Sequence, residues 1–169
     1  MNVREFLREY SRGDRNFAGV ILHGTDLSHC QLSDIDLRQA DLSGANLRGA
    51  DLSQANLRYA NLAKADLTQA VLSGAQLEEV NLAGAVLTGA KLDGTSLIRA
   101  DLQLADFTQA DLQGANLSDA NLYRANLHQA NLDGTCIEGV NVAGFDVSTA
   151  AIASKGSHVV AAAMSRARV

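Results

Sequence analysis

Histidine and cysteine side chains are the groups in this chain best suited to bind a metal ion or act as nucleophiles. The histidines are His23, His29, His128 and His158, and the cysteines are Cys30 and Cys136. Neither the spacing of zinc ligands nor an Asp–His–Ser arrangement connects them. Two cysteines are also too few for a disulfide framework. The sequence therefore predicts a protein that is not an enzyme and has no cofactor, no metal site and no catalytic residues.

Carboxylates are more numerous, and they recur in a strict five-residue pattern. A central apolar residue, nearly always Leu, occupies every fifth position from Phe17 to Val147. A small residue, usually Ala, stands two positions before each centre, and Asp or Asn usually stands directly before it. Short Asp and Asn side chains hydrogen-bond to nearby backbone in turns, so we expect a structural role for many of them.

A period of five fits neither a straight helix nor a straight strand. On a helix, five residues advance the chain by about 500°, which scatters the leucines around the axis. On a strand, side chains alternate with period two, so an odd period places successive leucines on opposite faces. The pattern becomes consistent if the chain turns a corner once per repeat. The sequence thus predicts a coil wound around its own aliphatic core.

Glycine marks the predicted corners. Most of the 14 glycines fall two residues after a centre, as Gly44 and Gly49 do. That place is the third position of a β-turn, where a type II turn needs a positive φ that Gly adopts without steric cost. We expect corners with Gln, Asp, Arg or Tyr at this place to use a different turn type.

These residues resemble the pentapeptide-repeat family, whose pattern is A(D/N)LxX. The resemblance covers residues 15 to 152, and the opening FLREYSRGDRNFAGVIL is similar to the start of many cyanobacterial members. It implies a right-handed quadrilateral β-helix of about seven coils with four repeats per coil. The period alone leaves three or four sides open. The family includes proteins that act on DNA gyrase by imitating duplex DNA, and many members of unknown function.

The ends of the chain depart from the repeat. Val3, Phe6, Leu7 and Tyr10 lie at helical spacing, which predicts a helix that caps the first coil, with a partner-binding helix as the alternative. The division is therefore a cap over 1–14, a solenoid over 15–153 and a tail over 154–169. The tail is helical, disordered or a dimerisation element. The charged N-terminus lacks the apolar stretch of a signal peptide, so we expect a soluble cytoplasmic protein without a membrane span.

Charge is spread unevenly over the four sides that four repeats per coil would create. The side centred on Leu27 and Leu47 sums to −3, and the side centred on Leu32 and Leu52 sums to −4. The sides centred on Leu37 and Leu42 sum to −2 and zero. Such a surface repels nucleic acid, so no direct nucleic-acid binding is expected. The predicted partner-binding surface comprises Asp51, Asp66, Asp93, Asp106, Asp111 and Asp133.

Two functions remain open at this level. The leading hypothesis is a non-enzymatic scaffold that binds an unidentified protein partner, as a monomer or as a dimer formed through its tail. The alternative, which the resemblance suggests, is a DNA mimic that modulates DNA gyrase or another type II topoisomerase. An acidic surface that serves only solubility is the plainest interpretation of the charge.

Overall fold

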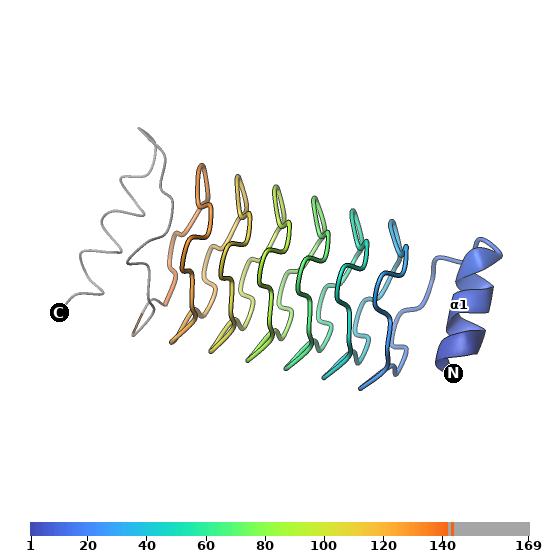
Figure 1. Cartoon of the computed structure of the whole chain (residues 1–169). Coiled ribbons are helices and arrows are strands. Elements are labelled where there is room, and N and C mark those ends of the chain that lie inside the picture. The colour runs from blue at the N-terminus through green and yellow to red at the C-terminus, as the bar shows by residue number, and fades with distance from the viewer. Residues whose placement is uncertain (142, 144–169) are drawn as a thin grey trace.

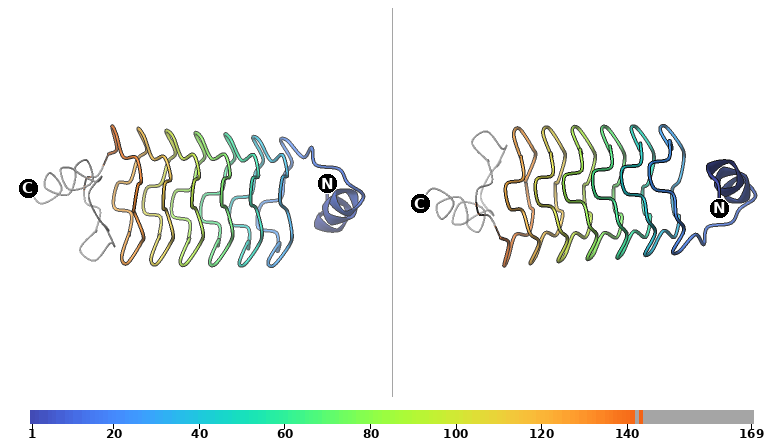
Figure 2. Two further views of the ribbon diagram at one scale, coloured as in Figure 1. Left: turned by 90° about the horizontal axis from the view of Figure 1, so that it is seen from above. Right: turned by 90° about the horizontal axis from the view of Figure 1, so that it is seen from below.

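The computed structural model describes residues 1–141 and 143 of the 169-residue chain. One helix, α1 (Val3–Ser11), lies at one end of a row of stacked coils (Figure 1). Seen from above and from below, the coils follow one another at even spacing along a straight axis (Figure 2). The last part of the predicted seventh coil and the tail over 154–169 lie outside the described residues.

The number of sides per coil follows from the register of the backbone pairing. Every paired residue bridges the residue 20 positions later in parallel orientation, from Asn16 with Asp36 to Asn121 with Asn141. Twenty residues are four repeats, so each coil has four sides. We name the sides after the centres Leu27, Leu32, Leu37 and Leu42, and each side continues at every twentieth residue. In the described part, the pairing consists of isolated bridges with no longer strand, because a corner interrupts the chain every five residues.

Hydrogen bonds between coils run through both the sides and the corners. On the Leu42 side, the Leu42 amide donates to the Asn61 carbonyl at 2.8 Å, and the Asn61 amide donates to the Ala40 carbonyl at 2.9 Å. At the next corner, the Gly44 amide donates to the Ala63 carbonyl at 2.9 Å. Backbone donors that face along the axis are thus satisfied by the neighbouring coil, which makes the stack continuous.

The corners are β-turns, as predicted, and they share a positive φ at their third residue. The amide of each small residue donates to the carbonyl of the preceding centre, as Ala45 does to Leu42 at 3.0 Å. Corners with Gln, Asp, Arg or Tyr at the third residue were expected to use a different turn, but their φ there has the same sign as at the glycine corners. The third residue of every corner, which recurs at each fifth position from 19 to 139, has a positive φ, including Gln39 at 59° and Tyr59 at 61°. Pairing between coils requires identical corners, so even unfavourable residues adopt the left-handed conformation.

The core is a column of central leucines alternating with small residues. From Leu37 to Leu132, the central residues and the small residues between them are buried, with Thr95 among them. The Thr95 hydroxyl donates to the Leu92 carbonyl at 2.8 Å, which satisfies the buried polar group. Four walls converge on this narrow column, so the alternation of large and small side chains fills it without excess volume.

Helix α1 covers the N-terminal end of this column. Phe6 is fully buried, and its ring meets the ring of Phe17 edge to face at 4.7 Å. The Tyr10 hydroxyl donates to the Ser33 carbonyl at 2.9 Å, which ties the helix to the first coil. Asn2 begins the helix by accepting the Glu5 amide at 2.9 Å. The helix predicted from the apolar spacing is therefore present, and it covers the first coil's apolar interior.

Candidate functional site

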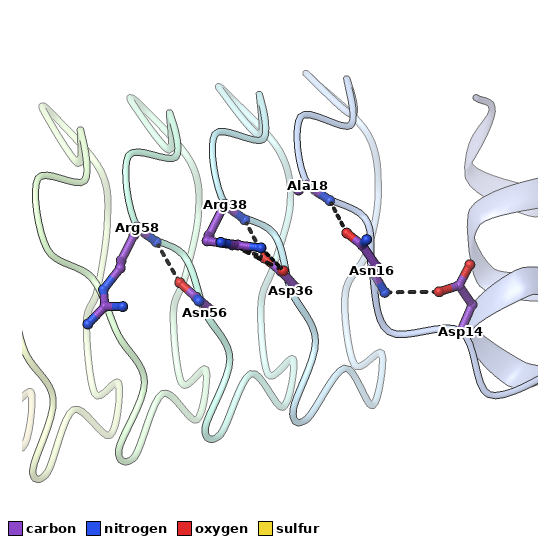
Figure 3. Close-up of polar contacts among 7 residues, drawn as sticks. All are labelled: Asp14, Asn16, Ala18, Asp36, Arg38, Asn56 and Arg58. Atoms are coloured by element: carbon purple, nitrogen blue, oxygen red, sulfur yellow. Dashed lines mark hydrogen bonds and ion pairs between the residues drawn. The ribbon is translucent and has the colours of Figure 1, made fainter.

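The Asp and Asn side chains that precede the centres are held by the corner that follows them. The Oδ1 atom of each accepts the amide two residues later, as Asp51 does from Ser53 at 2.9 Å. Figure 3 shows the contact in three successive coils of the Leu37 side, at Asn16, Asp36 and Asn56. The predicted bonding of these residues to nearby backbone is confirmed. The same bonds fix the direction in which each carboxylate faces the solvent.

Asn side chains extend this bonding from coil to coil. The Asn131 amide group donates to Asp111 Oδ1 at 2.9 Å, and the Asn46 amide group donates to Asp26 Oδ1 at 3.0 Å. In both pairs the two residues are 20 positions apart and occupy the same place on successive coils. In these pairs the carboxylate gains a second donor from the next coil without a neighbouring negative charge.

On the Leu27 side, Asp106 is the most extensively bonded of the predicted binding residues. Its Oδ1 atom accepts from the Thr108 amide at 3.0 Å, the Thr108 hydroxyl at 2.6 Å and the Asn126 amide group at 3.1 Å. Asp66 accepts from the Thr68 amide and hydroxyl at 3.0 and 2.6 Å, and forms a 3.1 Å ion pair with Arg48. Both carboxylates are half-buried and fixed in direction.

On the Leu32 side, the four predicted residues occupy two different positions of the repeat. Asp51 and Asp111 precede their centres and bond to the following corner. Asp93 and Asp133 follow their centres. Asp93 accepts the Ser73 hydroxyl at 2.5 Å, whereas the Asp133 carboxylate has no hydrogen-bond partner among the described residues. Asp133 is therefore the least constrained carboxylate of the six.

The structure places these six aspartates on two adjacent sides but does not bring them into one continuous row. Val71 and Lys91 separate Asp51 from Asp111 in the column of bridged residues. Val86, which is 37% exposed, separates Asp66 from Asp106. Within each column of equivalent positions the carboxylates are thus two or three coils apart, although Asp93, Asp111 and Asp133 lie on successive coils of the Leu32 side.

Hydrogen bonds lower the pKa of several of the acidic groups. The hydroxyl and amide of Ser28 lower the pKa of Asp26 below its ordinary value. Burial raises the pKa of Asp66, but the bonds from Thr68 and the charge of Arg48 outweigh burial, and the pKa is lowered overall. These groups keep their negative charge to lower pH than free aspartate does.

Ion pairs on the Leu37 side are a feature that the sequence analysis missed. Arg58 pairs with Glu78 at 2.8 Å across successive coils, and Arg99 pairs with Glu79 at 2.7 Å. Arg38 pairs with Asp36 within one repeat at 2.7 Å (Figure 3). Opposite charges 20 residues apart were the available signal, because the four repeats per coil that the resemblance implies place such residues on adjacent coils.

The histidines and cysteines form no cluster of three potential metal ligands in the part of the chain that the structure describes. Cys30 is half-buried against the core, where burial raises the pKa of its thiol. Cys136 is exposed, and its Sγ lies 3.3 Å from the Ser118 hydroxyl. A raised thiol pKa lowers the fraction of reactive thiolate, so Cys30 is suited to packing.

The family model described as pentapeptide repeats matches this chain in eight copies. The matched segments are residues 16–39, 35–74, 70–109 and 100–139, which together span most of the chain. The chain is a pentapeptide-repeat protein. Proteins of this family are generally structural or interaction modules rather than enzymes. No curated protein sequence matches this pentapeptide-repeat protein with significance.

Solved structures of other pentapeptide-repeat proteins are similar to this one. A protein of the cyanobacterium Cyanothece 51142 is 26% identical with a TM-score of 0.57, over 88% of this chain and 99% of that one. QnrB1, a plasmid-mediated fluoroquinolone resistance protein, is 15% identical with a TM-score of 0.56, over 91% of this chain and 98% of its own. That likeness concerns the fold alone.

A pentapeptide repeat protein of the Arabidopsis thaliana thylakoid lumen is 33% identical, over 62% of this chain and 69% of that one, with a TM-score of 0.47. Within the described residues, no helix has the length and hydropathy needed to cross a membrane.

Proposed function

We propose that this pentapeptide-repeat protein is a non-enzymatic scaffold that binds a protein partner through the acidic Leu27 and Leu32 sides. The observation that supports it best is the fixed orientation of the surface carboxylates. Asp106, with three donors on one oxygen, loses little conformational entropy when a partner binds. The partner would present cationic side chains, since the opposite charge attracts and orients it during encounter.

The regular spacing of the coils sets the distances between the carboxylates that such a partner would have to match. Bridged residues of successive coils lie about 4.8 Å apart, the usual distance between paired strands. Asp66 and Asp106 are two coils apart, so their backbones are roughly 10 Å apart along the axis, and Asp51 and Asp111 are three coils or roughly 14 Å apart. A rigid basic surface with Arg or Lys at these intervals is the chemistry that fits.

The second function that we propose, as the weaker alternative, is imitation of duplex DNA toward DNA gyrase or another type II topoisomerase. Two adjacent acidic sides favour it. Charge density argues against it, because these sides carry eight described carboxylates and two cations over six coils. That amounts to about one net charge per 5 Å of axis, against one per 1.7 Å in duplex DNA. The surface therefore has roughly a third of the charge density that it would have to imitate.

We also propose the right-handed winding that the family implies, because crossovers between parallel strands are right-handed in about 98% of cases. A cytoplasmic location is likewise a proposal, supported by the charged N-terminal segment.

One variant tests both functions. Replacing Asp51, Asp66, Asp106 and Asp111 by Asn removes four charges but keeps an Oδ1 acceptor at each corner. Asn already fills the same place at Asn56 and Asn81, where it accepts the corner amide. We therefore expect the variant to fold normally, which circular dichroism checks, and any loss of binding to reflect charge alone.

The readouts separate the scaffold from the mimic. Capture from a cell lysate with immobilised protein should retain a basic protein that the four-Asn variant does not retain. A capture without any such difference contradicts the scaffold proposal. In a gyrase supercoiling assay, inhibition at sub-micromolar protein that the variant lacks would make the mimic the function, and no inhibition at tens of micromolar would remove it.

A further inference from the structure

Exposed large apolar side chains gather on the Leu42 side and its two edges. Leu104 is 61% exposed and Tyr123 41% exposed at the edge that follows this side, and Tyr59 is 54% exposed at the edge before it. Ile21 lies on the same side in the first coil and is 63% exposed. Elsewhere on the described coils, Val86 is the one comparable residue. Four of the five exposed large apolar side chains of the described coils thus share one face, which favours this face over the other three as an interaction surface.

Leu104 is the most informative of these residues. Its φ is 57°, in the left-handed region that disfavours a branched apolar residue, and Gly occupies the same corner position at Gly84 and Gly44. The Leu104 amide donates to the Tyr123 carbonyl at 3.0 Å, so the two exposed side chains stand on adjacent coils. A glycine at position 104 would remove both the backbone strain and the exposed apolar surface, which indicates that the leucine contacts something.

The Leu42 side is also the one side without net charge, and its charges alternate along the axis. Asp41, Lys64, Asp101 and Arg124 lie in the second, third, fifth and sixth coils. The fourth coil contributes only uncharged residues, Asn81, Ala83 and Gly84. Lys64 and Arg124 are exposed and form no salt bridge within the part of the chain that the structure describes, as is also true of Lys91 on the Leu32 side, whereas Arg38, Arg48, Arg58 and Arg99 are all paired.

We propose that the Leu42 side binds the same side of a second copy of this chain, with the two rods antiparallel and a two-fold axis at the level of Leu82. In this arrangement the third coil faces the fifth coil of the second copy, so Lys64 is level with Asp101. The second coil faces the sixth, so Asp41 is level with Arg124. Each pair occurs twice, as two-fold symmetry requires.

Charge disfavours the other contacts between equivalent sides. Parallel rods would place each charge level with its own copy, Lys64 with Lys64 and Asp101 with Asp101, which is repulsive. The other three sides carry net negative charge and would repel themselves in any same-side contact. Among contacts between equivalent sides, antiparallel contact through the Leu42 side is thus the one that brings every charge of that side level with an opposite charge.

Two of the four exposed apolar and aromatic residues, Tyr59 and Leu104, fit the same arrangement. Tyr59 in the third coil becomes level with Arg99 in the fifth coil of the second copy, a pairing suited to a cation–π contact. The Leu104 side chain becomes level with the aliphatic stem of Lys64. The small residues Ala83 and Gly84 at the two-fold level let the faces approach closely. Tyr and Arg are the residue types most enriched at the energetic centre of interfaces.

Sedimentation equilibrium of the full-length protein tests the proposal. The wild type should reach twice its 17.8 kDa mass in a concentration-dependent way. Lys64→Asp and Asp101→Lys should each raise the dimer dissociation constant by about tenfold or more, because each creates two like-charge contacts. The double variant carrying both changes should recover the wild-type value to within about threefold, because opposite charges meet again.

Two further variants separate contact from folding. Leu104→Gly should weaken the dimer while the free energy of unfolding stays equal or rises, since it relieves the positive φ. Lys91→Asp makes the same charge change on the Leu32 side and should leave the dimer unchanged. A protein that stays monomeric into the sub-millimolar range overturns the proposal, as does a dimer that Lys64→Asp and Asp101→Lys do not weaken. The latter result would point to dimerisation through the tail.

Discussion

The side-chain amide of Gln54 lies over the α-carbon of Gly74, one coil further along the rod. A Cβ atom on residue 74 would collide with Gln54 Nε2 and lie 2.9 Å from its Cδ. Both residues occupy the third position of a corner and both have a positive φ, 58° at Gln54 and 67° at Gly74. The glycine at position 74 therefore serves its own backbone and also leaves room for a side chain of the preceding coil.

Glycine replacements at two corners should differ for this reason. Gly44→Ala should cost about 1 kcal/mol, since φ is 63° but no atom lies within 4 Å of the added Cβ. Gly74→Ala should cost more, because the Gln54 side chain must also move. Urea unfolding measures both. Adding Gln54→Ala should reduce the cost of Gly74→Ala to that of Gly44→Ala, and a cost that stays unchanged would contradict the contact.

The cap should be essential to the first coil. Phe6→Ala removes a fully buried ring that packs on Phe17, and we expect it to lower the free energy of unfolding by about 3–5 kcal/mol. Arg4→Ala, on the exposed face of α1, should change it by less than about 0.5 kcal/mol. Equal small effects of the two variants would show that α1 does not stabilise the coils.

Asp106 should tolerate Asn but not Ala. Asp106→Asn keeps an acceptor for the Thr108 amide, whereas Asp106→Ala leaves Thr108 and Asn126 without it and should cost about 1–3 kcal/mol. Asp133→Ala is the matched control, since the Asp133 carboxylate has no bonded partner in the described structure, and its effect should be near zero. Thermal unfolding distinguishes the three. A loss from Asp106→Asn as large as that from Asp106→Ala would mean that the charge, rather than the bonding, stabilises the corner.

Stability should fall in acid. Because hydrogen bonds and Arg48 hold the pKa of Asp66 below its ordinary value despite burial, the ionised carboxylate favours the folded state. A lowered folded-state pKa gives stability that is complete above the unfolded-state pKa and is lost as pH falls through the folded-state value. Asp26, Asp36 and Asp41 have lowered pKa values as well. Urea midpoints should therefore be flat near neutral pH and drop below about pH 4.

The variant Asp66→Asn provides the check on this pH dependence. It removes one titrating group, so its stability should decline less steeply with acid than that of the wild type. Asp133→Asn should follow the wild-type curve, because the Asp133 carboxylate has no bonded partner in the described structure. Parallel acid profiles for the wild type and Asp66→Asn would show that the ion pair with Arg48 and the Thr68 bonds do not act on the pKa.

The sequence by itself determined the local structure of each repeat. The central Leu and the Ala two residues before it can both be buried in every repeat only if the chain bends once per repeat. Gly at positions such as Gly44 indicates where the chain bends. The bonding role of Asp51 follows from the short reach of an Asx side chain. The helix over Val3–Ser11 could be predicted from the spacing of its apolar residues, because amphipathic periodicity is also a local property of the sequence.

The tertiary structure decided which repeats are neighbours in space, a choice between three and four sides that the five-residue period alone left open. The bridge from residue i to residue i + 20 sets four sides per coil, and this register depends on the corner angle, which composition does not encode. It forces Leu104 into a positive φ, pairs Arg58 with Glu78 and interrupts the acidic columns with Val86 and Lys91. Contacts between coils join residues that are distant in sequence, so a pattern of five cannot reveal them until the number of repeats per coil is known.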